Sequence, residues 1–483
     1  MTILRPLFAA ALLLAAAGLG EDLGTPRRAR IAGRLAADGE TAEFRLTPRS
    51  TGSLRATVET PGAADLDLAL LDDTGAPLAA ARRPGGGGEI LSAAVRAGIP
   101  LRLEIRAFSG APASYRLDLA VARDPRPGPV RSGRTRPVRP MATARCFHAA
   151  ADLPDGGAIV AGGTARADVK ELAILYALAS TEVCDARGRR FRPGPPLSAP
   201  RFGLTGTTLS DGRVLLAGGD LAGSADLFDP DSGGMTMVPL SGGTRFLHTA
   251  TLLSDGRVLL AGGVEVHLLP SPGYQALATS ELFDPKTGTF SPGPPLRAPR
   301  LSHAACLLPD GRVLLTGGEG RSDSEVVDPG PAFASLPGPP LAGPRDDHTA
   351  TLLPGGRVLV CGGQGPGGES VATAEVLDPG AGAFRTLDAM LPVPRSDHVA
   401  ILLPGGEVLL LGGERDPGND DDEILRAVDL FRPGTETFGS LPPLAVGRDD
   451  HRVVRLRSGR VLVTGGEDAG SLSIPDAELY DPR

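Results

Sequence analysis

A pair of adjacent glycines at the end of a short apolar run is the feature that most constrains how this chain folds. The pair recurs seven times, roughly every fifty residues. Self-similarity at such a period indicates a repeat architecture, in which each unit covers an apolar face of its neighbour. The first glycines of the seven pairs are Gly162, Gly218, Gly262, Gly317, Gly362, Gly412 and Gly465.

Each unit contains four short segments that are typical of β-strands. An Arg-x-x-His motif precedes an apolar stretch, as in residues 345–353, and a turn leads to the run that ends at the glycine pair, as in 355–360. A loop of variable length then precedes a third segment, as in 281–285, and a fourth, as in 289–296. One four-stranded sheet cannot bury both of its faces, whereas seven sheets packed around an axis bury each other. The sequence therefore predicts an all-β chain with a seven-bladed β-propeller.

Charged residues recur at two fixed positions of every unit. An arginine begins the Arg-x-x-His motif and an acidic residue lies on the third segment, which predicts buried or half-buried ion pairs that fix the register of each blade. Six units carry the histidine, and a position repeated once per blade favours a structural hydrogen-bonding role over metal binding. The arginines are Arg145, Arg201, Arg245, Arg300, Arg345, Arg395 and Arg448. The acidic residues are Glu182, Asp226, Glu281, Glu325, Glu375, Asp429 and Glu478. The histidines are His148, His248, His303, His348, His398 and His451, with Leu204 in the second unit.

The glycine pair, the Arg-x-x-His motif before it and the acidic-apolar-aromatic-Asp-Pro strand after it together resemble the kelch repeat. The resemblance covers residues 141–483 and implies a propeller of the galactose oxidase/kelch-like superfamily. Kelch repeats usually carry a Trp on the fourth strand, but this chain has no Trp, and Phe290, Phe384 and Phe438 take that place in three units. The last unit shows only three strands. We therefore expect residues 135–141, which are similar to a fourth strand, to complete the seventh blade.

The residues before the repeats divide into three parts. Residues 1–20 combine one positive charge, a short apolar run and small residues before Glu21, which is the pattern of a signal peptide. Residues 29–122 alternate apolar and polar side chains between turn signals and predict a small β-sandwich. Its Asp-Leu-Asp-Leu, Glu-Ile and Ser-Tyr-Arg-Leu segments resemble the bacterial pre-peptidase C-terminal domain, which implies an accessory module. Residues 123–134 form an Arg- and Pro-rich linker, and the propeller is expected over 135–483.

The parts that differ between units indicate the binding face. The loop after the glycine pair varies in length, and insertions on one face of a repeat array usually mark the binding side. Acidic residues collect there in units four to seven, and two long loops carry tyrosines that either contact a partner or fold over the rim. The candidate face residues are Asp346, Asp347, Asp397, Asp449, Asp450, Glu319, Glu414, Glu467, Tyr176 and Tyr274. Ca²⁺ prefers oxygen ligands, so the sixth loop offers a candidate calcium site, with solvated surface charge as the alternative. Its residues are Asp420, Asp421, Asp422 and Glu423.

Composition narrows the function classes. A formal net charge of −8 argues against nucleic acid as a partner. No apolar run after residue 20 is long enough to span a membrane. We expect an exported protein, periplasmic or extracellular, that presents a propeller face to a protein or glycan partner. It carries no catalytic residues in this interpretation, and no cofactor is expected apart from the candidate calcium.

Two alternatives stay open. One is a kelch-type enzyme, either carbohydrate-active or oxidase-like. A copper-radical oxidase would need a paired Tyr and Cys with further Tyr and His ligands, whereas Tyr115 lies in the sandwich and Tyr480 on a repeat strand. The other alternative is a structural component of the envelope or a coat. The four cysteines have no metal-binding spacing and are expected in the core; they are Cys146, Cys184, Cys306 and Cys361.

Overall fold

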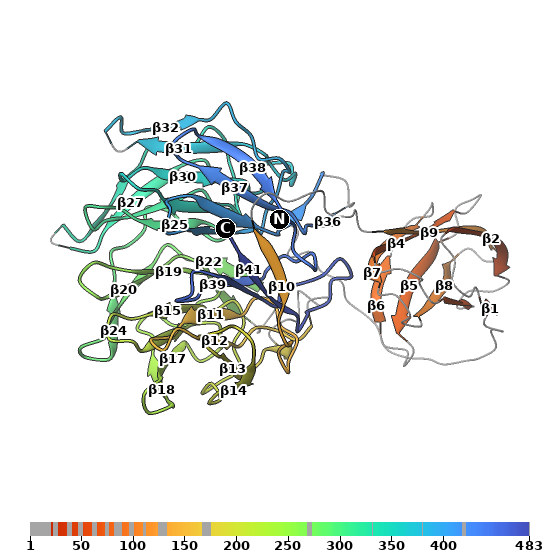
Figure 1. Ribbon diagram of the computed structural model, residues 1–483, viewed down its shortest axis with the longest axis horizontal. Helices are drawn as coiled ribbons and strands as arrows, with labels where there is room; N and C mark the ends of the chain where they lie inside the picture. Colours follow the sequence, from red (N-terminus) through yellow and green to blue (C-terminus); the bar gives the residue numbers. More distant parts are fainter. Residues whose placement is uncertain are drawn as a thin grey trace. The chain divides into compact units, whose positions relative to one another are not determined.

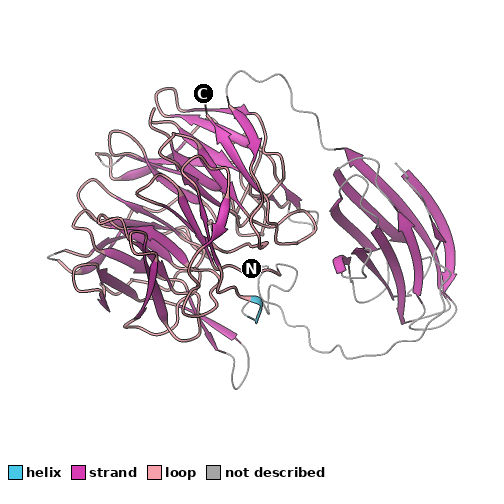
Figure 2. Cartoon of the chain, turned by 60° about the horizontal axis from the view of Figure 1, so that its bottom comes forward, coloured by secondary structure: helices cyan, strands magenta, loops and turns pink. Residues whose placement is uncertain are grey.

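The computed structural model describes residues 21–22, 28–35, 41–46, 52–59, 65–72, 77–81, 89–95, 101–109, 113–123, 133–166, 175–267, 273–330, 332–378, 380–417 and 422–482. The chain divides into two compact units, one built from the N-terminal strands and one from the remaining strands. Almost all regular structure is β-strand (Figure 2). No helix among the described residues is long and apolar enough to cross a bilayer. The predicted signal peptide, residues 1–20, lies outside the described residues.

The N-terminal unit is a β-sandwich of two sheets. One sheet has the strand order β1-β3-β8-β5-β6 and the other the order β2-β9-β4-β7. In β8, Leu101, Leu103 and Ile105 are buried while the residues between them are half-buried, so the predicted alternation turns one face of the sheet inward. The strands are β1 (Glu21–Asp22), β2 (Arg28–Leu35), β3 (Thr41–Leu46), β4 (Gly52–Glu59), β5 (Asp65–Asp72), β6 (Pro77–Ala81), β7 (Glu89–Val95), β8 (Leu101–Ser109) and β9 (Ala113–Arg123).

The second unit is a β-propeller of seven four-stranded antiparallel blades (Figure 1), which confirms the predicted fold class. The first strands of neighbouring blades lie side by side all the way around the axis. Blades 1 to 3 consist of β11 (Ala149–Asp152), β12 (Ala158–Ala161), β13 (Thr181–Cys184) and β14 (Phe191–Pro193); β15 (Thr205–Thr208), β16 (Val214–Ala217), β17 (Ser224–Asp229) and β18 (Gly234–Pro239); and β19 (Thr249–Leu252), β20 (Val258–Ala261), β23 (Ser280–Asp284) and β24 (Thr289–Pro292).

Blades 4 to 6 follow the same order along the chain. They consist of β25 (Ala304–Leu307), β26 (Val313–Thr316), β27 (Ser324–Asp328) and β28 (Ala334–Pro337); β29 (Thr349–Leu352), β30 (Val358–Cys361), β31 (Ala374–Asp378) and β32 (Ala383–Thr386); and β33 (Val399–Leu402), β34 (Val408–Leu411), β37 (Val428–Arg432) and β38 (Thr437–Leu441). Two hairpins are inserted after the second strands of blades 3 and 6: β21 (Val264–His267) with β22 (Gly273–Ala276), and β35 (Glu414–Arg415) with β36 (Glu423–Ile424).

Blade 7 combines the two ends of the propeller sequence. Its first three strands are β39 (Arg452–Arg455), β40 (Val461–Thr464) and β41 (Ala477–Asp481), and its fourth is β10 (Arg134–Pro137). β10 runs antiparallel to β41, with Thr135 opposite Tyr480, and the two lie side by side in Figure 1. The predicted closure by the segment before the first blade is therefore confirmed. Met141, at the end of the predicted segment, is buried, and its N–H donates to the carbonyl oxygen of Pro475 at 2.9 Å.

The core lies between neighbouring blades. The second strand is fully buried in every blade, as in Val358–Cys361, and each interface mixes apolar residues of two blades, as where Leu359 meets Leu410 and Phe431. Phenylalanines pack in pairs at the fourth strands where kelch repeats usually carry Trp. The rings of Phe283 and Phe290 lie 5.0 Å apart and those of Phe431 and Phe438 lie 4.9 Å apart, a spacing at which aromatic rings attract each other.

The glycine pair is explained by the neighbouring blade. Gly362 has a φ of +65°, which disfavours any side chain. A Cβ on it would lie 2.6 Å from the carbonyl oxygen of Arg395 and 2.7 Å from Cε1 of His398, both in the next blade. The histidine ring of one blade thus packs directly on the first glycine of the blade before it, and in blade 2 Leu204 takes this place on Gly162.

Candidate functional site

Each repeated arginine is buried and pairs with the repeated acidic residue of its own blade. The N···O distances are 3.2 Å for Arg145 with Glu182, 2.8 Å for Arg201 with Asp226, 3.2 Å for Arg245 with Glu281, 2.5 Å for Arg300 with Glu325, 2.7 Å for Arg345 with Glu375 and 2.8 Å for Arg448 with Glu478; Arg395 pairs with Asp429. All seven predicted pairs are present.

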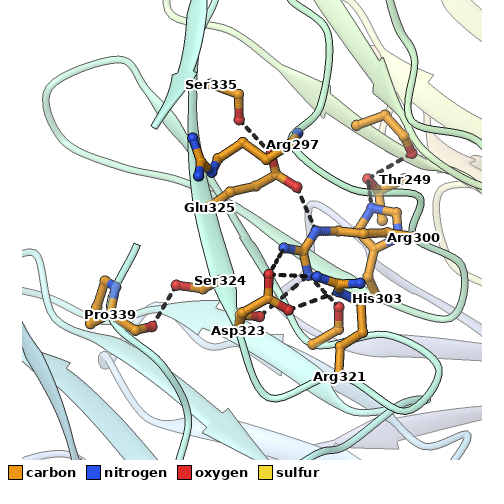
Figure 3. A network of polar contacts seen from close by, with 12 residues as sticks. Thr249, Arg297, Arg300, His303, Arg321, Asp323, Ser324, Glu325, Ser335 and Pro339 are labelled. Atoms are coloured by element: carbon orange, nitrogen blue, oxygen red, sulfur yellow. Dashed lines mark hydrogen bonds and ion pairs between the residues drawn. The ribbon is translucent and has the colours of Figure 1, made fainter. Parts of the chain in front are cut away.

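Figure 3 shows this network in blade 4. The Arg300 guanidinium lies between the carboxylates of Glu325 and Asp323, and it also donates to the carbonyl oxygen of Gly317 at 2.7 Å. Glu325 accepts the backbone N–H of Arg297 at 2.8 Å, from the segment that enters the blade. These contacts tie the entry segment, the glycine pair and the third strand together. The charges are satisfied within the blade, and this network is part of the framework rather than a ligand site.

The repeated histidines hold neighbouring blades together. Burial lowers the pKa of all six imidazoles below the ordinary value, so the rings are neutral at pH 7. Five of them share a hydrogen bond with a threonine of the preceding blade at 2.8 to 3.0 Å. The pairs are His148 with Thr464, His248 with Thr205, His303 with Thr249, His348 with Thr316 and His398 with Thr349.

His451 of blade 7 is the exception. Neither of its ring nitrogens has a hydrogen-bond partner among the described residues. The threonine stands either first on the first strand or last on the second, and these two positions face each other in the sheet. In blade 6 they are Val399 and Leu411, which cannot accept or donate.

The residue before each repeated histidine, or before Leu204 in blade 2, belongs to a ring around the propeller axis, which we call the inner ring. All seven backbones are left-handed, with φ between 45° and 61°. In five of the seven steps the N–H of one member donates to the carbonyl oxygen of the member in the preceding blade, at 2.8 to 3.3 Å. The members are Phe147, Gly203, Leu247, Ser302, Asp347, Asp397 and Asp450.

The inner ring is asymmetric in chemistry although its backbone repeats. Blades 1 to 3 supply Phe147, Gly203 and Leu247, whereas blades 5 to 7 supply Asp347, Asp397 and Asp450. Asp is among the residues that tolerate a left-handed backbone best, so the scaffold accepts carboxylates here at little cost. One arc of the ring is therefore apolar and the opposite arc acidic.

In blades 5 to 7, two further positions beside each ring member carry polar or acidic side chains. The residue before the ring member forms an isolated bridge with the residue after the glycine pair: Asp346 with Gln364, Ser396 with Glu414 and Asp449 with Glu467. Only blade 7 has carboxylates at all three positions. One carboxylate oxygen from each of Asp449, Asp450 and Glu467 lies within 4.8 Å of the other two.

Two carboxyl groups of the acidic arc, those of Asp347 and Asp397, have raised pKa values. Burial, the Asp347 carboxylate and the Asp450 carboxylate, in that order, raise the pKa of Asp397 well above its usual value. Burial and the neighbouring Asp346 raise the pKa of Asp347 to about 7. A positive charge, the Arg452 guanidinium, lies near the arc. Burial lowers the pKa of Arg452, and the negative charges of Asp450 and Asp397 partly oppose that effect.

Three other predicted face residues, Glu414, Tyr274 and Tyr176, are not part of the Asp449–Asp450–Glu467 trio. Glu414 of blade 6 accepts a hydrogen bond from Nε2 of Gln364, in the neighbouring blade 5, at 3.2 Å. Tyr274 lies on the inserted hairpin of blade 3, where burial and the nearby Glu319 raise its phenol pKa. Tyr176 is half exposed, and the Arg166 guanidinium covers its ring at 5.2 Å, a cation–π contact within the loop.

Two of the four predicted calcium residues fall in the described part of the chain. Asp420 and Asp421 lie outside the described residues, and Asp422 and Glu423 are exposed. Glu423 forms an ion pair with Arg415 at 3.6 Å across the β35–β36 hairpin. The sequence predicted Asp449, Asp450 and Glu467 as binding-face residues, but it did not predict that their carboxylates lie close together. The signal for it was present, because blade 7 alone has an acidic residue at all three repeat positions.

The described cysteines and repeated histidines offer little for covalent or acid–base chemistry. All four cysteines are buried and burial raises their thiol pKa, which lowers their reactivity. The six repeated histidines are buried between blades. Among the described residues, the group of potential metal ligands that converges consists of carboxylates alone, whereas copper favours imidazole and sulfur. These residues do not fit a copper oxidase centre.

The search of solved structures finds a fungal protein with the same fold. It is described as a novel fungal alcohol oxidase with catalytic diversity among the AA5 family, in complex with copper. The two share 17% sequence identity with a TM-score of 0.56, over 73% of this chain and 76% of that chain. At this identity the similarity shows the propeller fold alone. No protein-family model matches the sequence, and no curated protein matches it.

Proposed function

We propose that this chain is a kelch-type binding protein that presents its inner-ring face to a protein partner and performs no catalysis. The observation that carries the proposal is the chemical asymmetry of the ring. Phe147 and Leu247 stand on one arc and Asp347, Asp397 and Asp450 on the other, although the seven backbones are alike. A repeat that needed only stability would have no reason to separate these side chains.

The arrangement favours a segment that carries both basic and apolar side chains. An acidic arc attracts cations over several ångströms and speeds association. A half-buried phenylalanine and leucine opposite it offer apolar contact to the same segment. A glycan has fewer groups that match both arcs, and we treat it as the competing outcome.

The enzyme alternative has one supporting observation, the likeness to an oxidase, and this likeness concerns the fold. The residues of the inner ring include no His, Tyr or Cys. An envelope or coat role has no specific support in the described structure. Export, with cleavage before Glu21, is part of the proposal and is tested by mass spectrometry of the N-terminus of protein recovered from its source.

Binding is tested with the full chain against arrays of short peptides and of glycans, at low and high salt and with EDTA present. We expect peptides that combine Arg or Lys with apolar residues to bind, and salt to weaken them. The double variant Asp347→Asn/Asp397→Asn should lose this binding. Asp231→Asn, an exposed turn residue between β17 and β18, is the matched control and should retain it. Equal binding by the double variant, or glycan binding without peptide binding, would overturn the proposal.

A further inference from the structure

Blade 7 differs from the other blades at three repeat positions: the inner-ring member, the residue before it and the residue after the glycine pair. The corresponding residues are Asp346, Asp347 and Gln364 in blade 5, and Ser396, Asp397 and Glu414 in blade 6. Since the backbone repeats, the trios of blades 5 and 6 show what the same geometry looks like with one carboxylate replaced by an amide or a hydroxyl. Blade 7 is the one described blade in which all three are carboxylates.

The backbone fixes this trio rather than leaving it to side-chain freedom. The N–H of Glu467 donates to the carbonyl oxygen of Asp449 at 3.0 Å, and the N–H of Asp449 donates back at 3.3 Å. Successive residues on an extended strand point to opposite sides. The left-handed backbone of Asp450, with a φ of 45°, breaks this alternation, so that neighbouring carboxylates reach the same space.

A second observation points to a ligand in that space. Glu467 is 2% exposed, yet its Oε2 has no hydrogen-bond partner in the described structure. Buried carboxylate oxygens are normally satisfied by donors or by a cation. A carboxylate oxygen of Glu467 lies within 4.8 Å of carboxylate oxygens of Asp449 and Asp450, so this buried carboxylate group faces the other two.

From these contacts we propose that Asp449, Asp450 and Glu467 bind one divalent cation, Ca²⁺, at the blade 7 edge of the inner ring. Hard carboxylate oxygens suit Ca²⁺ or Mg²⁺ rather than Zn²⁺ or Cu²⁺. Ca²⁺ is favoured because it accepts irregular ligand sets completed by water, whereas Mg²⁺ demands near-octahedral geometry. The site differs from the sixth-loop location that the sequence suggested.

The surrounding charges are compatible with a cation. Asp397 lies close enough to act on its neighbours, and Cys146 of blade 1 lies near all three ligands, with its Sγ accepting a hydrogen bond from Ser473 at 3.3 Å. Arg452 is the opposing charge. A bound cation would relieve the repulsion among the three ligand carboxylates.

The inference is independent of partner binding and is tested with the metal alone. Calorimetric titration of the full chain with CaCl₂ should show one site, with a dissociation constant of about 10⁻³ M or lower, the range of extracellular calcium modules. Glu467→Gln keeps the side-chain shape and should weaken binding at least about tenfold. Asp346→Asn, at the position of blade 5 that corresponds to Asp449, removes one carboxylate charge outside the trio and should change the dissociation constant by less than about threefold.

Thermal unfolding provides a second readout. Ca²⁺ should raise the unfolding temperature of the wild type and of Asp346→Asn, but not that of Glu467→Gln or Asp450→Asn. Without Ca²⁺, Glu467→Gln should be at least as stable as the wild type, because it removes repulsion. No heat and no thermal shift in the wild type would overturn the proposal, as would undiminished binding by Glu467→Gln. The peptide assay contains EDTA, so either proposal can fail without the other.

Discussion

The buried arginine–carboxylate pairs predict an unusual pattern of variant stabilities, which blade 5 can test. Arg345 donates to Gly362 O at 3.1 Å, to Thr373 Oγ1 at 3.0 Å and to Glu375 Oε1 at 2.7 Å. Glu375 also accepts the N–H of Ala342 at 2.9 Å. Arg345→Met removes the cation but keeps the apolar length of the side chain, and it leaves the Glu375 carboxylate buried without its counterion.

We expect Arg345→Met to cost about 3–5 kcal/mol of unfolding free energy, the usual cost of breaking a buried pair from one side. The pair itself contributes less than this. Burial lowers the pKa of Arg345, and the Glu375 charge only partly opposes it, so the folded protein holds the cation at a net cost relative to water. Arg345→Met/Glu375→Gln removes both charges and should lose only about 1–3 kcal/mol, from the carbonyl oxygens that lack a donor.

The assay is urea unfolding of the full chain followed by circular dichroism, with midpoints compared at equal slope. Arg312→Ala is the control, because Arg312 and Asp310 form an exposed pair at 2.6 Å, for which a loss below about 1 kcal/mol is usual. The reasoning fails if Arg345→Met behaves like this control. It also fails if the double variant is less stable than the single one, because the remaining buried charge would then not be the cause.

Three further variants test other parts of the structure. Deleting residues 130–141 removes β10 and should lower the cooperativity and midpoint of thermal unfolding; unchanged melting would contradict the closure of blade 7. Val399→Thr places a hydroxyl where other blades have one and should give His451 its missing partner, raising stability by about 0.5–1.5 kcal/mol in urea unfolding, whereas a loss would show that the site cannot accept the hydroxyl. In Asp397→Asn the pH dependence should change. An Asp has a pKa of about 3.9 when unfolded, and the folded pKa of Asp397 is raised. The protonated group therefore contributes stability that is complete below about pH 4 and lost as pH rises through its folded pKa. Without divalent cations, the variant should melt above the wild type near pH 8 and match it near pH 4; equal curves throughout would contradict the shift.

The fold could be predicted from the sequence because each repeat requirement is local and recurs. Gly362 shows why: a left-handed φ and a histidine ring packed on the glycine leave room for no other residue, so the pattern survives in every blade. Arg345 and Glu375 recur for a similar reason, since neither can be buried without the other. Closure by β10 also followed from counting strands.

The candidate site was less accessible to sequence reasoning. The acidic residues of the binding face were named, and the calcium prediction was placed on a run of four acidic residues in the sixth loop, two of which lie outside the described residues. The proximity of the blade 7 carboxylates was not predicted, because adjacency in sequence is visible and adjacency in space is not. Asp449 and Glu467 come together through a pair of backbone hydrogen bonds across the glycine pair. Their proximity depends on register, which a single-residue change in loop length would alter.

The comparison among blades separates what the repeat needs from what it does not. Positions that hold the fold, such as Arg448, are the same in all seven blades, and where one partner is missing the mismatch is visible, as at His451. The inner ring behaves differently: its backbone is the same in every blade, but its side chains run from Phe147 through Ser302 to Asp450. Stability alone does not favour carboxylates crowded on one arc, since burial and their mutual repulsion raise the pKa of Asp397. This contrast is the reason that we propose a positively charged ligand for the acidic arc, either a metal ion or a basic segment.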